Sequence, residues 1–167
     1  MKTYIYSSLL FVIIISMNSC TKNSDYPIEE NDPSGDYTYT SYSKYNVDSD
    51  DESISATSDG FMFVSWYNQN TSSNIDITVN PDFGYSYYLR ASTIDTHGDT
   101  TTFRINSQVI NVNGDDYKIV GNKGVYVPYL GEYDGYFIQD KKIVYSFKST
   151  NIENYEITET YTEGVKY

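Results

Sequence analysis

The sequence predicts an all-β fold, a single closed antiparallel barrel, with a two-sheet sandwich as the alternative. From Gly35 onward apolar and polar residues alternate with a period of two, and no apolar stripe with a helical period of 3.6 residues persists. About ten such runs follow one another at intervals of roughly 8 to 12 residues, which is typical of sandwiches and small barrels. No unit repeats at a fixed period, which excludes a solenoid or a propeller.

The first expected strand has two distinct faces. Tyr37, Tyr39, Ser41, Ser43 and Tyr45 share one face, because side chains two apart in a strand point the same way. Tyr and Thr both favour strands. Further strands are expected over 53–57, 61–67, 75–79, 85–94, 101–112 with a bulge near Ser107 and Gln108, 117–120, 125–127, 135–139 with 143–147, and 155–162.

Turn residues separate these runs. Three pairs supply the positive φ angles of tight hairpin turns, and we expect a turn at each: Asp59–Gly60, Asn113–Gly114 and Asp134–Gly135. Residues 139–142 are expected to form a polar hairpin tip, and residues 80–82 an open loop.

The N-terminal segment, residues 1–19, is predicted to be an export signal. Lys2 is followed by a seven-residue apolar run over 9–15, far shorter than the roughly 20 residues that a transmembrane helix needs. The sole cysteine, Cys20, stands where the signal would be cut. With Met17 and Ser19 before it, this segment resembles the lipobox of bacterial lipoproteins, which implies that Cys20 is lipidated and anchors the protein to a membrane.

Residues 20–34 are predicted to be a flexible acidic tether, and residues 35–167 the folded domain. The tether is polar, contains Pro27 and Pro33, and lacks a hydrophobic period. The whole chain carries 11 basic and 23 acidic residues, a net charge of −12, which argues against nucleic acid as a partner. A single Cys excludes a disulfide framework, and with a single His it excludes multi-Cys zinc sites.

The order of features resembles the small lipocalin-like or calycin-like lipoproteins of unknown function that Bacteroidota produce. Lipobox and acidic tether are followed by a Gly-x-Tyr first strand at 35–37, then the stretches 105–108 and 119–124, and a Thr- and Tyr-rich closing strand at 157–161. The resemblance implies a lipocalin-like barrel anchored at the outer membrane, on the cell surface or the periplasmic face. It implies no catalytic residues and no cofactor.

The sequence contains little that indicates a catalytic or metal-binding site. His97 lies in an Asp-, Gly- and Thr-rich stretch typical of an exposed turn, and no phosphate loop, nucleophile elbow or zinc-protease motif is present. We therefore predict no enzyme. Asp48, Asp50 and Glu52 have the alternate spacing of Ca²⁺ ligands, but Ser53 replaces the glycine that the sharp turn of an EF-hand loop requires. A solvated loop is the preferred interpretation, and these three acids are the only Ca²⁺ candidates.

The high number of tyrosines is the feature of the composition that says most about a binding surface. The chain has 20 Tyr, and a buried phenol needs a hydrogen-bond partner, so we expect some rings to face solvent or a ligand. The Pro- and Gly-containing segment 126–136 gathers four of them. A second aromatic wall is expected from Trp66, Tyr67, Tyr85, Tyr87 and Tyr88. The predicted ligand-binding residues are Trp66, Tyr126, Tyr129, Tyr133 and Tyr136.

Two functions follow from these patterns. The first is a lipid-anchored binding or accessory module that recognises a glycan, a small apolar ligand or an outer-membrane protein through its Tyr-rich loops or the barrel mouth. The alternative is a structural component of an envelope or adhesin assembly with no small ligand.

Overall fold

The computed structural model describes residues 32–45, 55–69, 72–138 and 141–167, and every regular element in these ranges is a β-strand. These residues include no apolar helix of membrane-spanning length. The expected signal, Cys20, most of the tether and the Ca²⁺ candidates Asp48, Asp50 and Glu52 lie outside the described residues.

Twelve strands follow one another along the described chain. They are β1 (Gly35–Tyr45), β2 (Ser55–Gln69), β3 (Ser72–Pro81), β4 (Tyr87–His97), β5 (Thr100–Ile105), β6 (Gln108–Val112), β7 (Asp115–Gly121), β8 (Val125–Val127), β9 (Gly131–Tyr133), β10 (Gly135–Ile138), β11 (Lys142–Asn151) and β12 (Ile157–Lys166).

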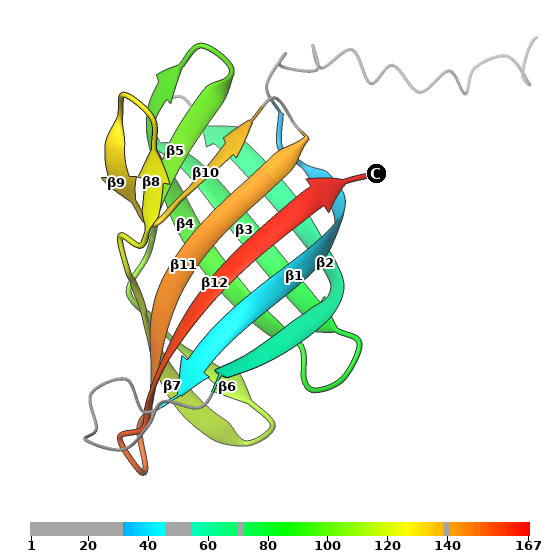
Figure 1. Ribbon diagram of the computed structural model, residues 1–167, viewed down its shortest axis with the longest axis vertical. Coiled ribbons are helices and arrows are strands. Elements are labelled where there is room, and N and C mark those ends of the chain that lie inside the picture. The colour runs from blue at the N-terminus through cyan, green and yellow to red at the C-terminus, as the bar shows by residue number, and fades with distance from the viewer. Residues whose placement is uncertain (1–31, 46–54, 70–71, 139–140) are drawn as a thin grey trace, which may run out of the picture.

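Eight of these strands close into one antiparallel barrel (Figure 1). β1 to β5 form a meander, β10 pairs with β5 and β11, and β12 pairs with β11 and with β1, which closes the wall. The predicted single barrel of lipocalin-like type is confirmed, and the two-sheet alternative is wrong. A closed wall satisfies the backbone hydrogen bonds that an open sheet would leave at its edges.

One position in the wall is shared by two strands. β10 pairs with the N-terminal half of β11, with Gly135 opposite Tyr145. β7 pairs with the C-terminal half of β11, with Gly121 opposite Phe147. Between them, residues 122–134 leave the wall and form the β8–β9 hairpin. Ser146 stands opposite the gap, where its N–H donates to the carbonyl of Asp134 at 2.7 Å.

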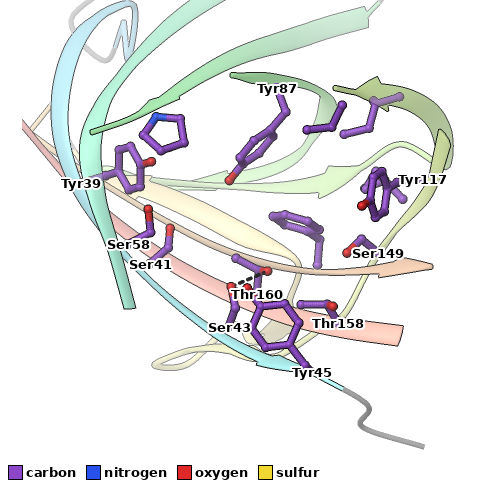
Figure 2. A pocket seen from close by; sticks show the side chains of 15 residues that line it. Tyr39, Ser41, Ser43, Tyr45, Ser58, Tyr87, Tyr117, Ser149, Thr158 and Thr160 are labelled. Carbon is purple, nitrogen blue, oxygen red and sulfur yellow. Dashed lines mark hydrogen bonds between the residues drawn. The ribbon is translucent and has the colours of Figure 1, made fainter. Parts of the chain in front are cut away.

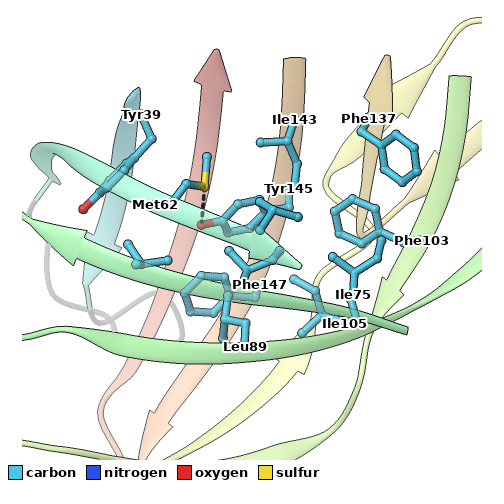
Figure 3. Close-up of a cluster of buried hydrophobic side chains, with 14 of the residues drawn as sticks. Tyr39, Met62, Ile75, Leu89, Phe103, Ile105, Phe137, Ile143, Tyr145 and Phe147 are labelled. Carbon is cyan, nitrogen blue, oxygen red and sulfur yellow. Dashed lines mark hydrogen bonds between the residues drawn. The ribbon is translucent and has the colours of Figure 1, made fainter. Parts of the chain in front are cut away.

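The two ends of the barrel differ in how they are filled. The end where β1 begins is packed with apolar side chains, among them Met62, Phe103, Phe137 and Ile143, and these are almost fully buried (Figure 3). We call this the closed end. The other end, where β1 finishes and the β6–β7 hairpin lies, is the open end (Figure 1).

Two of the three predicted hairpin turns are wrong. Asp59–Gly60 lies inside β2, which is one long strand rather than two, and Gly60 has no positive φ. Gly60 instead allows the backbone of β3 to lie close to β2, because a Cβ at this position would collide with the carbonyl oxygen of Asn80. Gly135 likewise opens β10 and lies so close to Phe103 that a Cβ would collide with its ring.

The third turn is confirmed, whereas the single bulged strand expected over 101–112 is wrong. Asn113 and Gly114 have φ angles of 55° and 98°, and they join β6 to β7. The long run over 101–112 is interrupted at Asn106 and Ser107, which separates β5 from β6. This break lies beside the predicted bulge near Ser107 and Gln108, and it allows β6 to continue toward the open end with a different partner strand.

Candidate ligand-binding cup

A cavity of about 250 Å³ opens at the open end of the barrel, and we refer to it as the cup (Figure 2). The floor of the cup is the boundary of the core that faces the open end, because Tyr39, Ile119 and Phe147 belong both to the core cluster and to the cavity wall. The cup is lined by Tyr39, Ser41, Ser43, Tyr45, Ser58, Pro81, Tyr87, Ile110, Val112, Tyr117, Ile119, Phe147, Ser149, Thr158 and Thr160.

Strand alternation places these side chains in the cup. On β1 the inward face passes from buried Tyr37 through Tyr39 and Ser41 to Ser43 and Tyr45, so one strand contributes both to the core and to the cup. The period-two pattern predicted that these five side chains share one face, and the structure shows that this face points inward. β11 and β12 contribute in the same way, through Phe147 with Ser149 and Thr158 with Thr160.

The β6–β7 hairpin forms one side of the cup with Ile110, Val112, Tyr117 and Ile119. β7 holds it to β11 through backbone pairing. On the other side the side-chain amide of Gln108 replaces strand pairing: its Nε2 donates to the carbonyl of Arg90 and its Oε1 accepts from the N–H of Arg90, both at 3.2 Å.

The lining combines aromatic surface with hydroxyl groups. Four Tyr and six Ser or Thr give ten hydroxyls among the fifteen lining residues, and the other five are apolar. Among the residues that the structure describes, no carboxylate, amine, guanidinium or imidazole belongs to the lining. Such a surface can accept and donate hydrogen bonds without placing a full charge against the ligand.

Several of the hydroxyls are bonded to one another. The hydroxyls of Ser43 and Thr160 lie 3.1 Å apart, and Tyr39 is hydrogen-bonded to Ser58. Tyr87 is hydrogen-bonded to Tyr145 beneath the floor. Since each hydroxyl has one proton and two lone pairs, oxygens bonded in this way still have acceptor capacity that faces the cup.

Burial keeps the phenols of the floor neutral. It raises the pKa of Tyr87 well above the ordinary value and raises the pKa of Tyr39 as well, with the carboxylates of Asp82 and Asp59 adding to the effect on Tyr39. The ring of Phe147 stacks on that of Tyr145, with 6.3 Å between the ring centroids, and its centroid lies 6.1 Å from that of the Tyr87 ring. The floor is therefore an uncharged aromatic layer.

The residues predicted to bind a ligand lie elsewhere. Trp66 packs against Phe137 at the closed end and donates from Nε1 to Ser73 at 2.6 Å. Tyr126 and Tyr129 are exposed on the β8–β9 excursion. The half-buried Tyr133 and Tyr136 are likewise not among the cup residues.

Of the expected second aromatic wall, Tyr87 alone lines the cup. The sequence prediction relied on Tyr residues that are close together in the chain, whereas the four Tyr of the cup come from three strands, β1, β4 and β7. The available signal was the first strand, whose inward face alternates from Tyr to Ser rather than continuing with aliphatic residues. The predicted turn residue His97 is exposed, but it is the last residue of β4 and the turn follows it at residues 98–99.

The described residues contain no group of three or more His, Cys, Asp or Glu side chains that could hold a metal ion. A comparison with protein-family models finds no match, and a comparison with curated proteins finds none either.

Proposed function

We propose that this protein is a lipid-anchored envelope lipoprotein whose barrel is a binding module, and that the cup takes a small ligand with an apolar body. The observation that carries the proposal is the cup itself, a cavity with an aromatic floor and a hydroxyl-bearing wall that borders the buried apolar core of the barrel. Small-molecule sites are concave and largely apolar, with a few polar groups that fix orientation.

The direction of the chain supports an anchor on the opposite side from the cup. The chain enters the barrel at the closed end, where the hydroxyl of Tyr37 donates to the carbonyl of Pro33 at 2.6 Å and the N–H of Trp66 donates to Ser34 at 2.9 Å. A lipid on Cys20 would hold the protein by this end. The mouth of the cup would then face away from the outer membrane, toward a diffusing ligand.

The size of the cup favours a small ligand over a glycan chain. Its volume of about 250 Å³ lies just below the roughly 300 to 1,000 Å³ of drug-sized ligand sites. A ring with a short polar substituent fits this space, whereas a polysaccharide needs an extended groove. The hydroxyls suit such a substituent because they serve as donors or acceptors.

Thermal unfolding in the presence of 2-phenylethanol tests the proposal. A ligand at a hundred times its dissociation constant stabilises the folded state by about 2.7 kcal/mol, so the midpoint should rise by several degrees. Ser149→Trp fills the cup from β11 and should abolish the rise. Thr150→Trp places the same ring on the outer face of the same strand and should leave the rise intact.

Two outcomes would contradict this assignment. A midpoint that responds equally in the Ser149→Trp and Thr150→Trp variants would place the ligand outside the cup. Loss of the response in Tyr129→Ala and Tyr133→Ala, with Ser149→Trp unaffected, would place it in the Tyr-rich segment 126–136 instead.

A second candidate function, a structural component of an envelope or adhesin assembly, is favoured by exposed aromatics on the outer wall. Phe61 is 51% exposed and Phe63 is 46% exposed on β2, and the ring of Tyr167 lies 6.3 Å from that of Phe61. Exposed aromatic clusters mark protein contacts. Phe61→Ser with Phe63→Ser should then abolish co-purification with an envelope protein without changing the response to 2-phenylethanol.

A further inference from the structure

The open end of the barrel carries an unequal share of acidic residues. Asp82, Asp115, Asp116, Glu153 and Glu156 lie at strand ends and in turns around the mouth, and Asp59 lies inside β2 next to Gly60, which is opposite Pro81. The described basic residues in this region are Lys44 on β1 and Lys118 on β7. We call these eight residues the rim, and its formal charge is 2 − 6 = −4. The ion pair between Lys148 and Glu159, at 2.7 Å, lies nearby and adds no net charge.

Rim acids are next to cup residues in the chain. Asp59 follows Ser58, Asp82 follows Pro81, and Asp116 precedes Tyr117. The N–H of Asp82 donates to the carbonyl of Asp59 at 2.9 Å, which fixes these two rim acids beside each other. Neighbouring side chains of a strand point to opposite faces, so the carboxylates of Asp59 and Asp116 lie on the outer wall, where they accept hydrogen bonds from Thr40 and Asn111. The negative field of the rim reaches the mouth of the cup from outside, and the described lining contains no charged side chain that would neutralise it.

We infer that the ligand of the cup is a small organic ammonium cation with an apolar body. The inference rests on the proposed function and specifies the charge of the ligand. The apolar body would occupy the floor formed by Tyr39, Tyr87 and Phe147, and the ammonium group would lie at the mouth near Tyr45 and Tyr117, between the phenols and the rim.

Three features of the cup agree with a cation. The rings of Tyr39, Tyr45, Tyr87 and Tyr117 surround the space (Figure 2), and aromatic faces attract cations. The hydroxyl oxygens that are already bonded to one another can accept a further hydrogen bond from an N–H donor. An anion, in contrast, would meet the repulsion of the rim without any Lys or Arg in the lining.

The orientation with the ammonium at the mouth follows from the cost of desolvation. Burying an isolated ammonium in a site without a counter-charge is unfavourable, so the head should remain where water and the rim carboxylates reach it. Tyr45 is 41% exposed at the end of β1, which places a partly solvated phenol at the mouth. The buried floor contains no counter-charge and suits the apolar body.

A series of three ligands of one shape tests the inference: phenethylamine, 2-phenylethanol and phenylacetate, which carry charges of +1, 0 and −1. Their dissociation constants are measured by calorimetry with the purified protein at low ionic strength. We expect phenethylamine to bind about tenfold more tightly than 2-phenylethanol, and phenylacetate to bind more weakly than both.

A pair of charge variants locates the source of this preference. Asp82→Asn with Asp115→Asn and Glu156→Gln neutralises three rim side chains, none of which has a hydrogen bond in the described structure that the amide would break. The control, Asp36→Asn with Asp99→Asn and Glu132→Gln, removes the same charge away from the mouth. The rim variant should lose about three- to tenfold of the preference for the cation, and the control should lose none.

The outcomes separate the inference from the proposed function. Equal affinity for phenethylamine and 2-phenylethanol, both lost in Ser149→Trp, would overturn the cation inference and leave the cup as the site. A preference for the cation that is equal in the rim variant and the control would also overturn it. Binding that survives Ser149→Trp, or no binding of any of the three, would overturn both.

Discussion

The carboxylate of Asp134 accepts a hydrogen bond from the backbone N–H of Ile105 across the barrel wall, at 3.0 Å. Its other oxygen accepts from the N–H of Lys123 at 2.9 Å, and the residue is 4% exposed. This side chain occupies the gap between the end of β7 and the start of β10. A buried carboxylate thus takes the place of a strand and satisfies backbone donors that the interrupted wall would otherwise leave unpaired.

Asp134→Ala should reduce the free energy of unfolding by about 2 to 4 kcal/mol, because two N–H groups lose a charged acceptor. Asp134→Asn retains one acceptor oxygen and should cost less. Urea unfolding measures both, and Glu132→Gln, an exposed change two residues away, is the control. An Asp134→Ala variant as stable as this control would show that water replaces the carboxylate.

Gly121→Ala should be more harmful than an ordinary Gly→Ala change in a strand. A Cβ at Gly121 would lie 1.8 Å from Oδ2 of Asp134, and this buried carboxylate is held by two hydrogen bonds. The cost should fall sharply when Gly121→Ala is introduced into Asp134→Ala, since the colliding atoms are gone. Additive costs in this double-mutant cycle would contradict the steric explanation.

Gly60→Asn and Gly98→Asn should differ strongly, although both glycines adjoin an Asp, Asp59 and Asp99, in turn-like sequence. Gly98 has a φ of 61°, which Asn adopts readily, and a Cβ there meets no atom within 4 Å. At Gly60 a Cβ would lie 2.8 Å from the Cα of Pro81 and closer still to the carbonyl of Asn80. We expect a loss below about 1 kcal/mol at Gly98 and more than about 2 kcal/mol at Gly60, measured by urea unfolding.

Stability should fall as the pH rises above about 10, where tyrosine in an unfolded chain ionises. Burial raises the pKa of Tyr87 and Tyr145 in the folded state, so the folded protein retains protons that the unfolded chain has lost. The stabilisation is complete below pH 10 and decreases above it. In denaturant titrations between pH 9 and 11, Tyr145→Phe should have a shallower slope than the wild type, and Tyr129→Phe, at a fully exposed position, should match the wild type.

The fluorescence of Trp66, the single tryptophan, should report unfolding but not occupancy of the cup. Its indole lies at the closed end against Phe137, and Nε1 donates to Ser73. Its emission should remain constant when 2-phenylethanol is added under conditions in which tyrosine emission changes. A shift of the Trp66 emission maximum on binding would instead support the earlier assignment of Trp66 to the ligand site.

The fold class was predictable because it depends on local patterns. Period-two alternation specifies strands, and it correctly placed the alternate residues from Tyr37 to Tyr45 on one face of the first strand. The turn at Asn113–Gly114 was predictable for the same reason, since positive φ is a property of those two residues. The glycines at 60 and 135 were misread, because the requirement there comes from strands distant in sequence.

By itself the sequence determined the all-β class, the two faces of the first strand and an acidic charge balance, and it favoured a barrel over a sandwich. These properties follow from the spacing and type of neighbouring residues. The tertiary structure alone decided which Tyr residues meet, because the cup draws them from β1, β4 and β7. It also decided that Asp134 replaces a strand and that acids collect at the mouth, since both depend on which segments barrel closure brings together.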